Sequence, residues 1–546
     1  MPELLFPRED SPELTYDDAF LLPYNTTERQ VREVATTEEV DGLNRLADYI
    51  FLESEEGIPV ASEVHARHRR HLLDLAEKYG IGESVSRDDA DFCPQDGLGN
   101  TPIVIANMNT VVGPQMAETA ARVGATAAIP QDREDDDLRR IAEYLRTRHP
   151  TYVTPATVTT GDTLGDFHRR LLRYDMNTAV VVDGDGVFLG VLHDADVKPG
   201  SREEQTIQRA GFRRSDVVTA WDGIIPLEAM DVLKKANAAT LPVLRKDGTV
   251  AGVITRKSAA LSLRYAPHVN DEAGGLAMLA AVGAFNRNPL DRVRLLIELK
   301  VRGIILDTAH FDQGIRGYRN LERARDLIEQ ADYKPALIAG NIVTREGVRD
   351  ILAAGADIVK VGIGPGAMCT TRMETGVGRP QLSAVLDCAY EASIRGKHVW
   401  ADGGIQHPRD LALALAAGAS QGMIGTLFVP TWESPGTFQH DLEGRRYKAH
   451  AGMASRQAAM LRNGGNKTAE RAAVEDILGP RSEGVADVRM YQHEERSSAA
   501  DVIHWMMNGV TSSMSYVGAR TLEEFSAFAR IGMQTRAGFE EGKPRM

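Results

Sequence analysis

One loop combines a cysteine with several glycines and two adjacent threonines, a combination typical of a nucleophile beside a backbone anion site. It reads VGIGPGAMCTTRMETGVGRPQ and runs from Val361 to Gln381. Gly364 and Gly366 let the backbone approach a ligand closely, because glycine adopts conformations that a Cβ forbids. Peptide N–H and C=O groups can then point at a phosphate or a cation. Cys369 lies among them, and its thiolate would be the nucleophile.

Eight short apolar runs, each followed by a helical pattern, must position this loop. Near-continuous apolar strands alternating with helices indicate a parallel sheet buried on both faces. Eight such units close a (β/α)8 or TIM barrel, an α/β fold whose chemistry lies in the loops after the strands. The predicted strands are Ile103 to Asn107, Thr126 to Pro130, Leu276 to Gly283, Gly303 to Ala309, Pro335 to Asn341, Asp357 to Gly364, His398 to Gly404 and Gln421 to Leu427.

An internal repeat interrupts this pattern between the second and third units. Thr178 to Val191 (TAVVVDGDGVFLGV) aligns with Thr240 to Val253 (TLPVLRKDGTVAGV) at an offset of 62 residues. Each copy predicts a β-hairpin, because an Asp-Gly turn separates two apolar runs. The two-copy module, residues 151–266, resembles a tandem pair of cystathionine-β-synthase (CBS) domains, a Bateman module. The resemblance implies regulatory binding of purine nucleotides such as ATP and GTP; the alternative is a domain that packs and binds nothing.

Composition excludes several other classes of protein. Of the 546 residues, 43% are hydrophobic and 26% are charged, as in globular proteins. The formal net charge of −14 argues against a nucleic-acid partner. The three cysteines, Cys93, Cys369 and Cys388, form no Cys-x-x-Cys pair, so neither a disulfide framework nor a thiolate zinc site is expected. Without a signal-peptide pattern or an apolar run of about 18 residues, we expect a cytoplasmic protein and no membrane contact.

The expected domains follow from the repeat and the barrel. Residues 1–150 would be the first part of the barrel, with a charged, helix-forming insertion at about 31–85 to which we assign no function. Residues 151–266 would be the tandem module. Residues 267–546 would complete the barrel and carry a flap at about 447–500.

The cysteine loop resembles the active-site loop of the family that contains IMP dehydrogenase and GMP reductase. The resemblance covers nearly the whole chain apart from the 31–85 stretch, and it implies the same barrel. Further matching passages are LTYDDAFLLP (14–23), ANMNTV (106–111), ADGGI (401–405), GTLF with ESPG (425–428 and 433–436), YKAHAGMAS (447–455) and GVTSSMSYVGARTLEEF (509–525).

The resemblance implies a site for a purine 5′-monophosphate, GMP or IMP. Asp402 would accept hydrogen bonds from both ribose hydroxyls, a task suited to a carboxylate. Ala367 departs from the serine usual in the family and removes one hydroxyl from the phosphate cradle. The other substrate residues implied are Gly403, Gly404, Gly425 and Thr426 with their N–H groups, Tyr447 with its phenol, and Met108, Gly452 and Met453 around the base.

Catalytic and cofactor roles also follow from the resemblance. Both family reactions pass through a covalent bond between Cys369 and C2 of the purine. A reductase must protonate the departing amine, and the family pattern assigns this proton transfer to Thr371 and Glu483. The nicotinamide of NADPH would lie at Asp307, with Thr308 and Ala309, and loop position alone suggests Arg287 for a 2′-phosphate. The main-chain carbonyls of Gly364, Gly366 and Cys369 match the family's site for a monovalent cation, K⁺.

Three functions stay open at this point. The first is an NADPH-dependent GMP reductase of purine salvage, similar to the actinobacterial-type reductases that retain paired regulatory domains. It is favoured because residues 461–483 lack the adjacent Arg-Tyr pair with which the dehydrogenase activates water. The second is an NAD-dependent IMP dehydrogenase that uses Arg481 or Arg489 instead. The third is a non-catalytic nucleotide-binding regulator, which the intact Cys369 loop disfavours. Without a Gly-x-Gly-x-x-Gly between strand and helix, no Rossmann domain is indicated, and the family suggests a homotetramer or homo-octamer.

Overall fold

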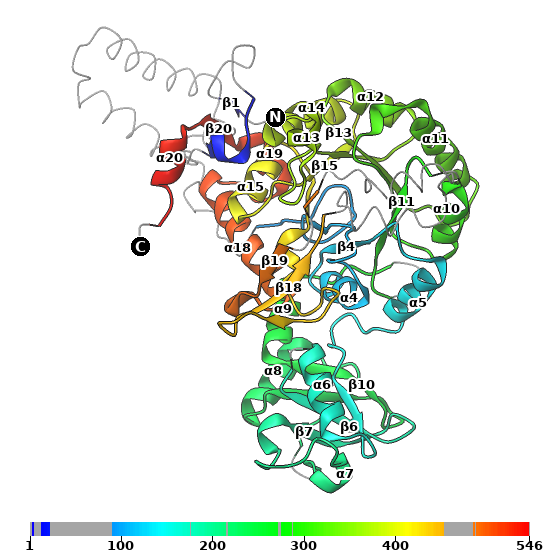
Figure 1. Cartoon of the computed structure of the whole chain (residues 1–546), viewed down its shortest axis with the longest axis vertical. Coiled ribbons are helices and arrows are strands. Elements are labelled where there is room, and N and C mark those ends of the chain that lie inside the picture. The colour runs from blue at the N-terminus through cyan, green and yellow to red at the C-terminus, as the bar shows by residue number, and fades with distance from the viewer. Residues whose placement is uncertain are drawn as a thin grey trace, which may run out of the picture.

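Eight parallel strands close a barrel at the centre of the molecule (Figure 1). The computed structural model describes residues 3–4, 13–21, 90–174, 176–214, 217–270, 275–286, 288–452, 484–485 and 488–544. The chain passes around the barrel in sequence order, and β16 pairs with β3 to close it, so the predicted barrel is confirmed. Its strands are β3 (Ile103–Ile105), β4 (Thr126–Ile129), β11 (Leu279–Gly283), β12 (Gly303–Asp307), β13 (Ala336–Ile342), β14 (Ile358–Val361), β15 (His398–Asp402) and β16 (Gln421–Ile424).

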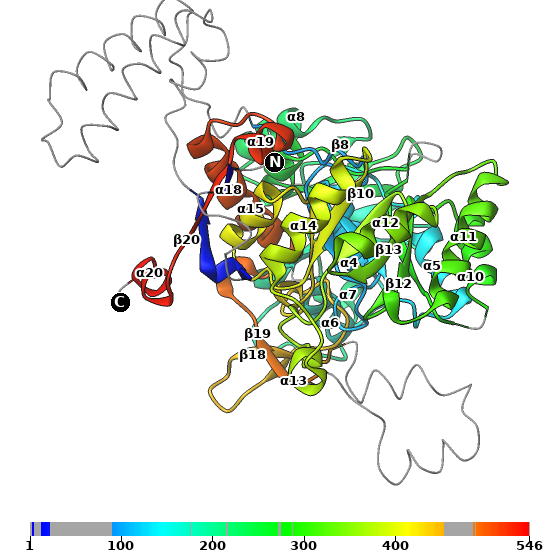
Figure 2. The same cartoon turned by 90° about the horizontal axis from the view of Figure 1, so that it is seen from above.

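Helices cover the outside of the barrel and bury the outward side chains of its strands (Figures 1 and 2). This packing explains why the strands are apolar on both faces. Alanine-rich helices such as α15 lie close to the strands, where small side chains permit a short separation. The outer helices are α4 (Pro114–Arg122), α5 (Asp135–Arg146), α10 (Pro289–Glu298), α11 (Ile315–Glu329), α12 (Arg345–Ala353), α14 (Gln381–Ser393), α15 (Pro408–Ala416) and α18 (Ala499–Val517).

Alternate residues of each strand point into the barrel and fill it. Val104, Ile305, Ile358 and Trp400 belong to one buried cluster inside the barrel, separate from the larger core between strands and helices. Because successive side chains of a strand point to opposite faces, residues two positions further along also point inward. Positions 307, 360 and 402 therefore lie above this apolar layer, at the carboxyl end of the barrel where chemistry occurs.

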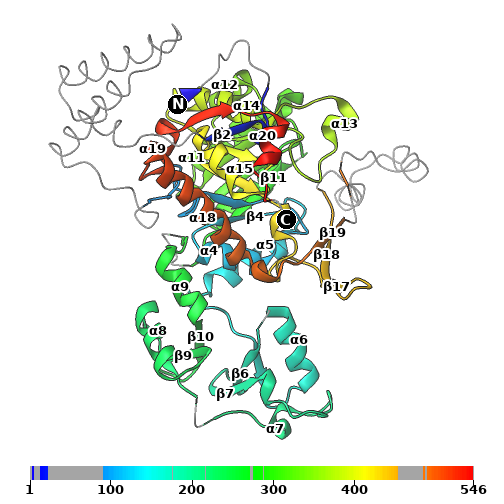
Figure 3. The same cartoon turned by 90° about the vertical axis from the view of Figure 1, so that its left-hand side faces the viewer.

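Two three-stranded sheets form a separate module between β4 and β11, and Figure 3 shows it projecting from the barrel. The hairpin strands repeat at the predicted offset, since Thr178–Val182 matches Thr240–Leu244 and Phe188–His193 matches Val250–Thr255. Its elements are β5 (Thr157–Thr159), α6 (Leu164–Tyr174), β6 (Thr178–Val182), β7 (Phe188–His193), α7 (Ile207–Ala210), β8 (Ala220–Trp221), α8 (Pro226–Lys235), β9 (Thr240–Leu244), β10 (Val250–Thr255) and α9 (Arg256–Arg264).

The remaining elements flank the barrel. One sheet has the order β1-β20-β2 and another the order β17-β18-β19. The predicted insertion at 31–85 lies outside the described residues. Across the described helices, none combines the length and the apolar character needed to cross a bilayer. The elements are β1 (Glu3–Leu4), β2 (Ala19–Leu21), α13 (Thr371–Thr375), β17 (Gln439–His440), β18 (Arg446–His450), β19 (Val488–Tyr491), α19 (Leu522–Phe528), β20 (Arg530–Met533) and α20 (Arg536–Glu541).

A buried carboxyl group joins the segment after β16 to α18. Glu433 is 2% exposed, and its Oε2 accepts a hydrogen bond of 2.9 Å from the N–H of Ala499, the first residue of α18. Burial raises the pKa of Glu433 to about 7, although the Lys448 ammonium acts in the opposite direction. The native state therefore holds this proton more tightly than the unfolded chain does, and its contribution to stability is lost as pH rises through about 7.

We expect the Glu433→Gln variant to gain stability relative to the wild type as the pH rises. Glutamine keeps the acceptor for Ala499 but has no proton to lose. Between pH 5 and pH 8 the difference in unfolding free energy should move by up to about 3 kcal/mol in favour of the variant. Urea unfolding of both proteins across this range measures the difference, and a difference that does not change with pH would contradict the assignment.

Candidate active site

A large cavity among the described residues opens at the carboxyl ends of the barrel strands. Its volume is about 1,060 Å³, enough for a nucleotide and part of a second ligand. The cavity brings together residues that lie more than 300 positions apart in the sequence. The residues predicted from sequence that line it are Met108, Asp307, Thr308, Ala309, Gly364, Gly366, Cys369, Thr371, Asp402, Gly403, Gly404, Gly425, Thr426 and Gly452.

Cys369 is held in the loop after β14 by its own backbone. Its N–H donates to the carbonyl of Gly366 at 2.9 Å, and its thiol donates to Thr371 Oγ1 at 3.2 Å. Gly364 has a φ of 79°, which permits the turn ahead of the cysteine. The half-buried sulfur therefore faces the cavity with a hydroxyl beside it, as a nucleophile with a proton-transfer partner requires.

Residues that follow much later in the sequence lie next to the cysteine loop. Cys369 forms an isolated antiparallel bridge with Gly484, and the N–H of Val485 donates to Met368 O at 3.0 Å. The N–H of Gly452 in turn donates to Val485 O at 2.9 Å. Figures 2 and 3 both show α13 and the β18–β19 pair at the same end of the molecule. Two parts of the predicted flap, at Gly452 and at Gly484 and Val485, thus lie beside the cysteine loop.

The strand ends of β15 and β16 offer open backbone donors. Gly403 and Gly404 both have positive φ, 93° and 81°, a geometry that turns successive N–H groups toward one point. Within the described ranges, no acceptor is bonded to the backbone N–H of Gly404, Gly425 or Thr426, and all three line the cavity. Gly403 differs, since its N–H lies 3.4 Å from Met423 O. Three open donors in one cavity suit a phosphate.

A buried lysine connects the two predicted carboxylates. Lys360 of β14 is 2% exposed, and its Nζ lies 2.8 Å from Asp307 Oδ1 and 2.5 Å from Asp402 Oδ2. Burial lowers the pKa of Lys360, but the two carboxylates outweigh it and raise the pKa above its usual value. Gly340 of β13 makes the space, because a Cβ there would lie 2.6 Å from Lys360 Cβ. The lysine is therefore charged and fixes both carboxylates.

Two amides complete this network. Asn107 Nδ2 donates to Asp307 Oδ2 at 3.0 Å, and Asn341 Nδ2 donates to Asp402 Oδ2 at 2.9 Å. Asn341 Oδ1 is buried without a hydrogen-bond partner among the described residues, and Asn341 lines the cavity. It offers an acceptor to a ligand hydroxyl or amide, because a buried polar atom is costly to leave unpaired.

Sequence reasoning missed several residues of this site, among them Asn107, Asn341, Lys360 and Arg496. For Lys360 a signal was present, since a lysine two positions after an inward-facing isoleucine in an otherwise apolar strand must point into the barrel. Arg496 lines the cavity and stacks on the Trp505 ring at 4.0 Å. It comes from a turn after β19, and nothing in its sequence context pointed to the barrel.

Other predicted residues lie elsewhere. Tyr447 is not part of the cavity lining, and its hydroxyl donates to Gln439 Oε1 at 2.8 Å. Arg489 stacks on the ring of Tyr447 at 5.0 Å and is also absent from the lining. Glu483, Met453, Arg481 and Arg287 lie outside the described residues.

The predicted cation site consists of carbonyls and involves no acidic cluster. In the described part of the chain, no group of three or more His, Cys, Asp or Glu side chains could hold a metal ion. Gly366 O accepts the N–H of Cys369 and keeps a second lone pair. Neutral carbonyls of this kind suit a monovalent cation. The cation site itself stays a prediction.

Comparisons with known proteins agree with the geometry. A sequence model described as "IMP dehydrogenase / GMP reductase domain" matches residues 98–545. Proteins named GMP reductase from Mycobacterium bovis and Mycobacterium tuberculosis are 40% identical over 463 residues, which cover 85% of this chain and 94% of theirs. Inosine-5′-monophosphate dehydrogenase of Aquifex aeolicus is 33% identical over 447 residues, 81% of this chain and 88% of that protein.

A solved structure supports the fold over nearly the full length. The crystal structure of a GMP reductase from Trypanosoma brucei in complex with guanosine 5′-monophosphate matches with a TM-score of 0.60. The match covers 98% of this chain and 99% of the other at 23% sequence identity. At that identity the likeness establishes the fold alone.

We expect Lys360→Met to lower the unfolding free energy by about 3–5 kcal/mol, because it leaves two buried carboxylates without their cation. Combining it with Asp307→Asn should recover part of the loss, since one stranded charge is then removed. Urea unfolding followed by circular dichroism measures both variants. Lys334→Met, which removes an exposed lysine paired with Glu329, is the control and should cost at most about 1 kcal/mol. A double variant no more stable than Lys360→Met would contradict the conclusion that Lys360 neutralises Asp307 and Asp402.

Proposed function

The chain belongs to the IMP dehydrogenase / GMP reductase family of oxidoreductases, and we propose that within it the chain is a GMP reductase. The reaction would be reductive deamination of GMP to IMP and ammonia, a step of purine salvage. The observation that carries the proposal is the hydrogen bond of 3.2 Å between the Cys369 thiol and Thr371 Oγ1 inside the main cavity. The 40% identity to the mycobacterial GMP reductases supports the reductase direction.

The nucleotide would be held at three points. The open N–H groups of Gly404, Gly425 and Thr426 would bind the 5′-phosphate. Asp402, oriented by Lys360, would accept the ribose hydroxyls through the oxygen that the lysine does not occupy. Anchoring both the phosphate and the ribose fixes the distance from C2 of the base to the cysteine, as near-attack geometry requires.

The Cys369 thiolate would add to C2 of the guanine ring and form a C–S bond. The exocyclic amine would then take up a proton and leave as ammonia, which breaks the C–N bond and keeps the purine attached to sulfur. Thr371 would pass this proton, with Glu483 as its source, because an amine leaves well only when protonated. Hydride addition at C2 would break the C–S bond and return the thiolate, so that GMP, NADPH and two protons give IMP, NADP⁺ and ammonium.

NADPH would supply the hydride, and Asp307, Thr308 and Ala309 would hold its nicotinamide end. Asp307 ends β12, Thr308 and Ala309 follow it, and all three line the main cavity; β12 lies four strands around the barrel from β16. Asp307 is fixed by Lys360 and Asn107, so it can orient a ligand without moving. K⁺ at the carbonyls of Gly364, Gly366 and Cys369 would hold the cysteine loop in its turn.

The alternative is an NAD-dependent IMP dehydrogenase, which oxidises IMP to XMP. It needs a group that activates water for hydrolysis of the C–S adduct. Among the two arginines considered for this role, Arg489 stacks on Tyr447 outside the cavity. That contact and the missing Arg-Tyr pair favour the reductase.

We further propose that residues 151–266 are a tandem CBS module that senses ATP and GTP. The repeated hairpins and helices support this reading. The module is also bonded to the barrel, because buried Glu118 of α4 accepts hydrogen bonds from Thr154, near the start of the module, as well as from Arg122 and from Tyr144 of α5. The protein would be cytoplasmic and a homotetramer or homo-octamer, as the family suggests.

Absorbance at 340 nm should fall when the protein is mixed with GMP and NADPH and should not rise with IMP and NAD. Cys369→Ala should abolish turnover, because no other group can form the C2 adduct. Thr371→Val should lower kcat by a factor on the order of 10²–10⁴, the usual range for a lost proton-transfer group. Cys93→Ala removes an exposed cysteine and should leave kcat unchanged. A rise in absorbance with IMP and NAD would assign the dehydrogenase, and no change in either assay would favour a regulator.

Deletion of residues 151–266 should leave GMP reduction measurable and remove its response to ATP and GTP. The barrel strands on either side of the module pair directly, β4 with β11, so the barrel can close without it. Initial rates at several ATP and GTP concentrations, compared between full-length and shortened proteins, provide the measurement. A nucleotide response that survives the deletion would place the sensor elsewhere.

A further inference from the structure

The main cavity has few positive side chains to balance the phosphate group that Gly404, Gly425 and Thr426 are proposed to bind. Among the described residues that line it, the lysines and arginines are Lys360 and Arg496. Lys360 is bonded to two carboxylates, which neutralise its charge. A phosphate monoester carries nearly two negative charges at neutral pH. Arg496 is therefore the lining side chain whose charge is free to balance them.

The guanidinium of Arg496 is held in place by a ring and has no acceptor of its own. The side chain is half-buried, and within the described ranges it forms no ion pair and no side-chain hydrogen bond. Its Cζ lies over the indole of Trp505, 4.0 Å from the ring centroid. A cation over an aromatic face is held by the electrons of the ring. The five N–H donors are thus left for a ligand, and arginine binds phosphate best through two of them in parallel.

Helix α18, which carries Trp505, packs against both loops that offer the phosphate donors. Gly509 lies one turn after Trp505, where any side chain would collide with Pro408 at the start of α15, just after the loop of Gly404. Figures 1 and 3 both show α15 beside α18. The helix also contacts the short 3-10 helix η4 (Thr426–Phe428), which begins at one of the donors. The ring that supports Arg496 therefore lies on the phosphate side of the cavity.

Two further contacts tie Arg496 to these loops. The ring centroids of His407 and Trp505 are 6.5 Å apart in a T-shaped contact, and both side chains line the cavity. The N–H of Trp432, in the segment after β16, donates to Ser497 O at 3.0 Å, next to Arg496 in the chain. Both the side chain and the backbone of Arg496 are thus positioned by the elements that follow β15 and β16.

We propose that Arg496 binds the 5′-phosphate of the purine nucleotide, as the positive partner of the three open N–H groups. The proposal rests on the proposed function for the identity of the nucleotide. An arginine at this place selects a nucleoside 5′-monophosphate over the nucleoside, which has the same base and ribose but lacks the charge. A residue that only packed on Trp505 would not discriminate between the two.

Calorimetric titration with GMP and with guanosine tests this selection without turnover. Arg496→Gln keeps a polar side chain and removes the charge, so it should weaken the binding of GMP by about 10- to 100-fold, the usual effect of losing a hydrogen bond to a charged group. It should leave the affinity for guanosine unchanged. Arg496→Lys, which keeps the charge, should weaken GMP binding less than Arg496→Gln does. An equal loss of affinity for GMP and guanosine, or an unchanged affinity for GMP, would overturn the proposal.

Steady-state rates give a second measurement. Arg496→Gln should raise the KM for GMP and leave kcat and the KM for NADPH unchanged, because the phosphate contact is the same in the ground state and the transition state. The matched control is Arg140→Gln, which removes an equal charge from an exposed position on α5 and should leave all three constants unchanged. A rise in the KM for GMP that is as large in the control would reduce the effect to net charge and count against Arg496.

The proposed function and this proposal fail separately. If GMP is reduced and Arg496→Gln keeps the wild-type KM, the proposed function stands and the role of Arg496 is refuted. If no GMP reduction is observed, the proposed function fails, and the titration with GMP and guanosine still decides whether Arg496 binds the phosphate. If IMP oxidation is observed instead, the same titration with IMP and inosine makes the decision.

Discussion

The ammonium group of Lys360, held between two carboxylates inside the barrel, is the constraint on which the active site depends. A lysine that is 2% exposed requires neutralisation, and Asp307 and Asp402 supply it from strands on either side of β14: β12, two strands away, and the adjacent β15. The lysine also reduces the repulsion between the two carboxylates, so both can remain charged close to each other. The side chain proposed to hold ribose and the one proposed to hold nicotinamide are therefore positioned by a single cation, which fixes the separation of the two ligands.

Close packing around Lys360 and between the neighbouring loops explains why positions 340 and 403 are glycines. Gly340 stands beside Lys360 where any side chain would collide with it, and Gly403 approaches Pro365 of the cysteine loop, where an added Cβ would lie 3.0 Å from the proline ring. The phosphate donors and the nucleophile come from adjacent loops that touch each other. The ion pairs of Lys360 inside the barrel and the close packing of the loops at its mouth leave the residues of the site little freedom, as preorganised catalysis requires.

The barrel was predictable because parallel strands buried on both faces give unmistakable apolar runs. Seven of the eight predicted runs contain the observed strand, and β13 extends one residue beyond its run, to Ile342. That Cys369, Asp402 and the glycines would lie together at the barrel mouth was predictable because their loops combine rare residue types, whereas their roles stay predictions. Lys360 was not identified, because a charged residue inside an apolar run looks like an exposed position unless the strand alternation is followed. Tyr447 was placed by motif alone, and its hydroxyl instead bonds Gln439, because the pairing of β18 with β17 decides where it points.

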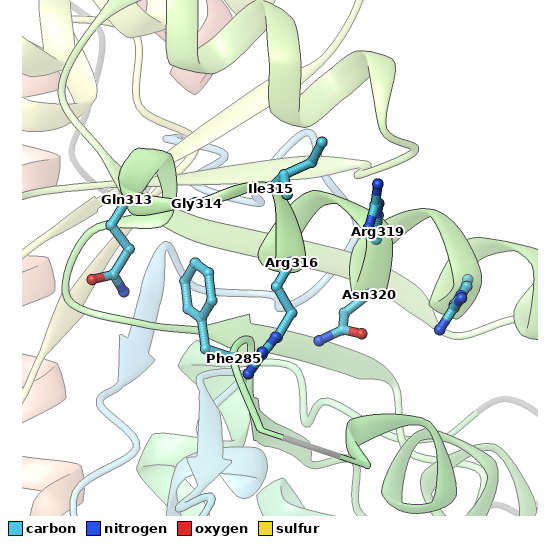
Figure 4. A pocket seen from close by; sticks show the side chains of 8 residues that line it. Phe285, Gln313, Gly314, Ile315, Arg316, Arg319 and Asn320 are labelled. Atoms are coloured by element: carbon cyan, nitrogen blue, oxygen red, sulfur yellow. The ribbon is translucent and has the colours of Figure 1, made fainter.

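The distribution of charge around the two cavities separates their chemical roles. The two carboxylates and one ammonium at the barrel mouth leave a single net negative charge, whereas the wall of a cavity of about 750 Å³ along α11 has three arginines, Arg316, Arg319 and Arg323, and no carboxylate (Figure 4). An anionic group is favoured beside these arginines and disfavoured near Asp307. A ring that becomes cationic on losing hydride is favoured near Asp307 instead. The site at which a cationic ring is favoured therefore lies in the same cavity as Cys369, and the three arginines that favour an anion lie outside it.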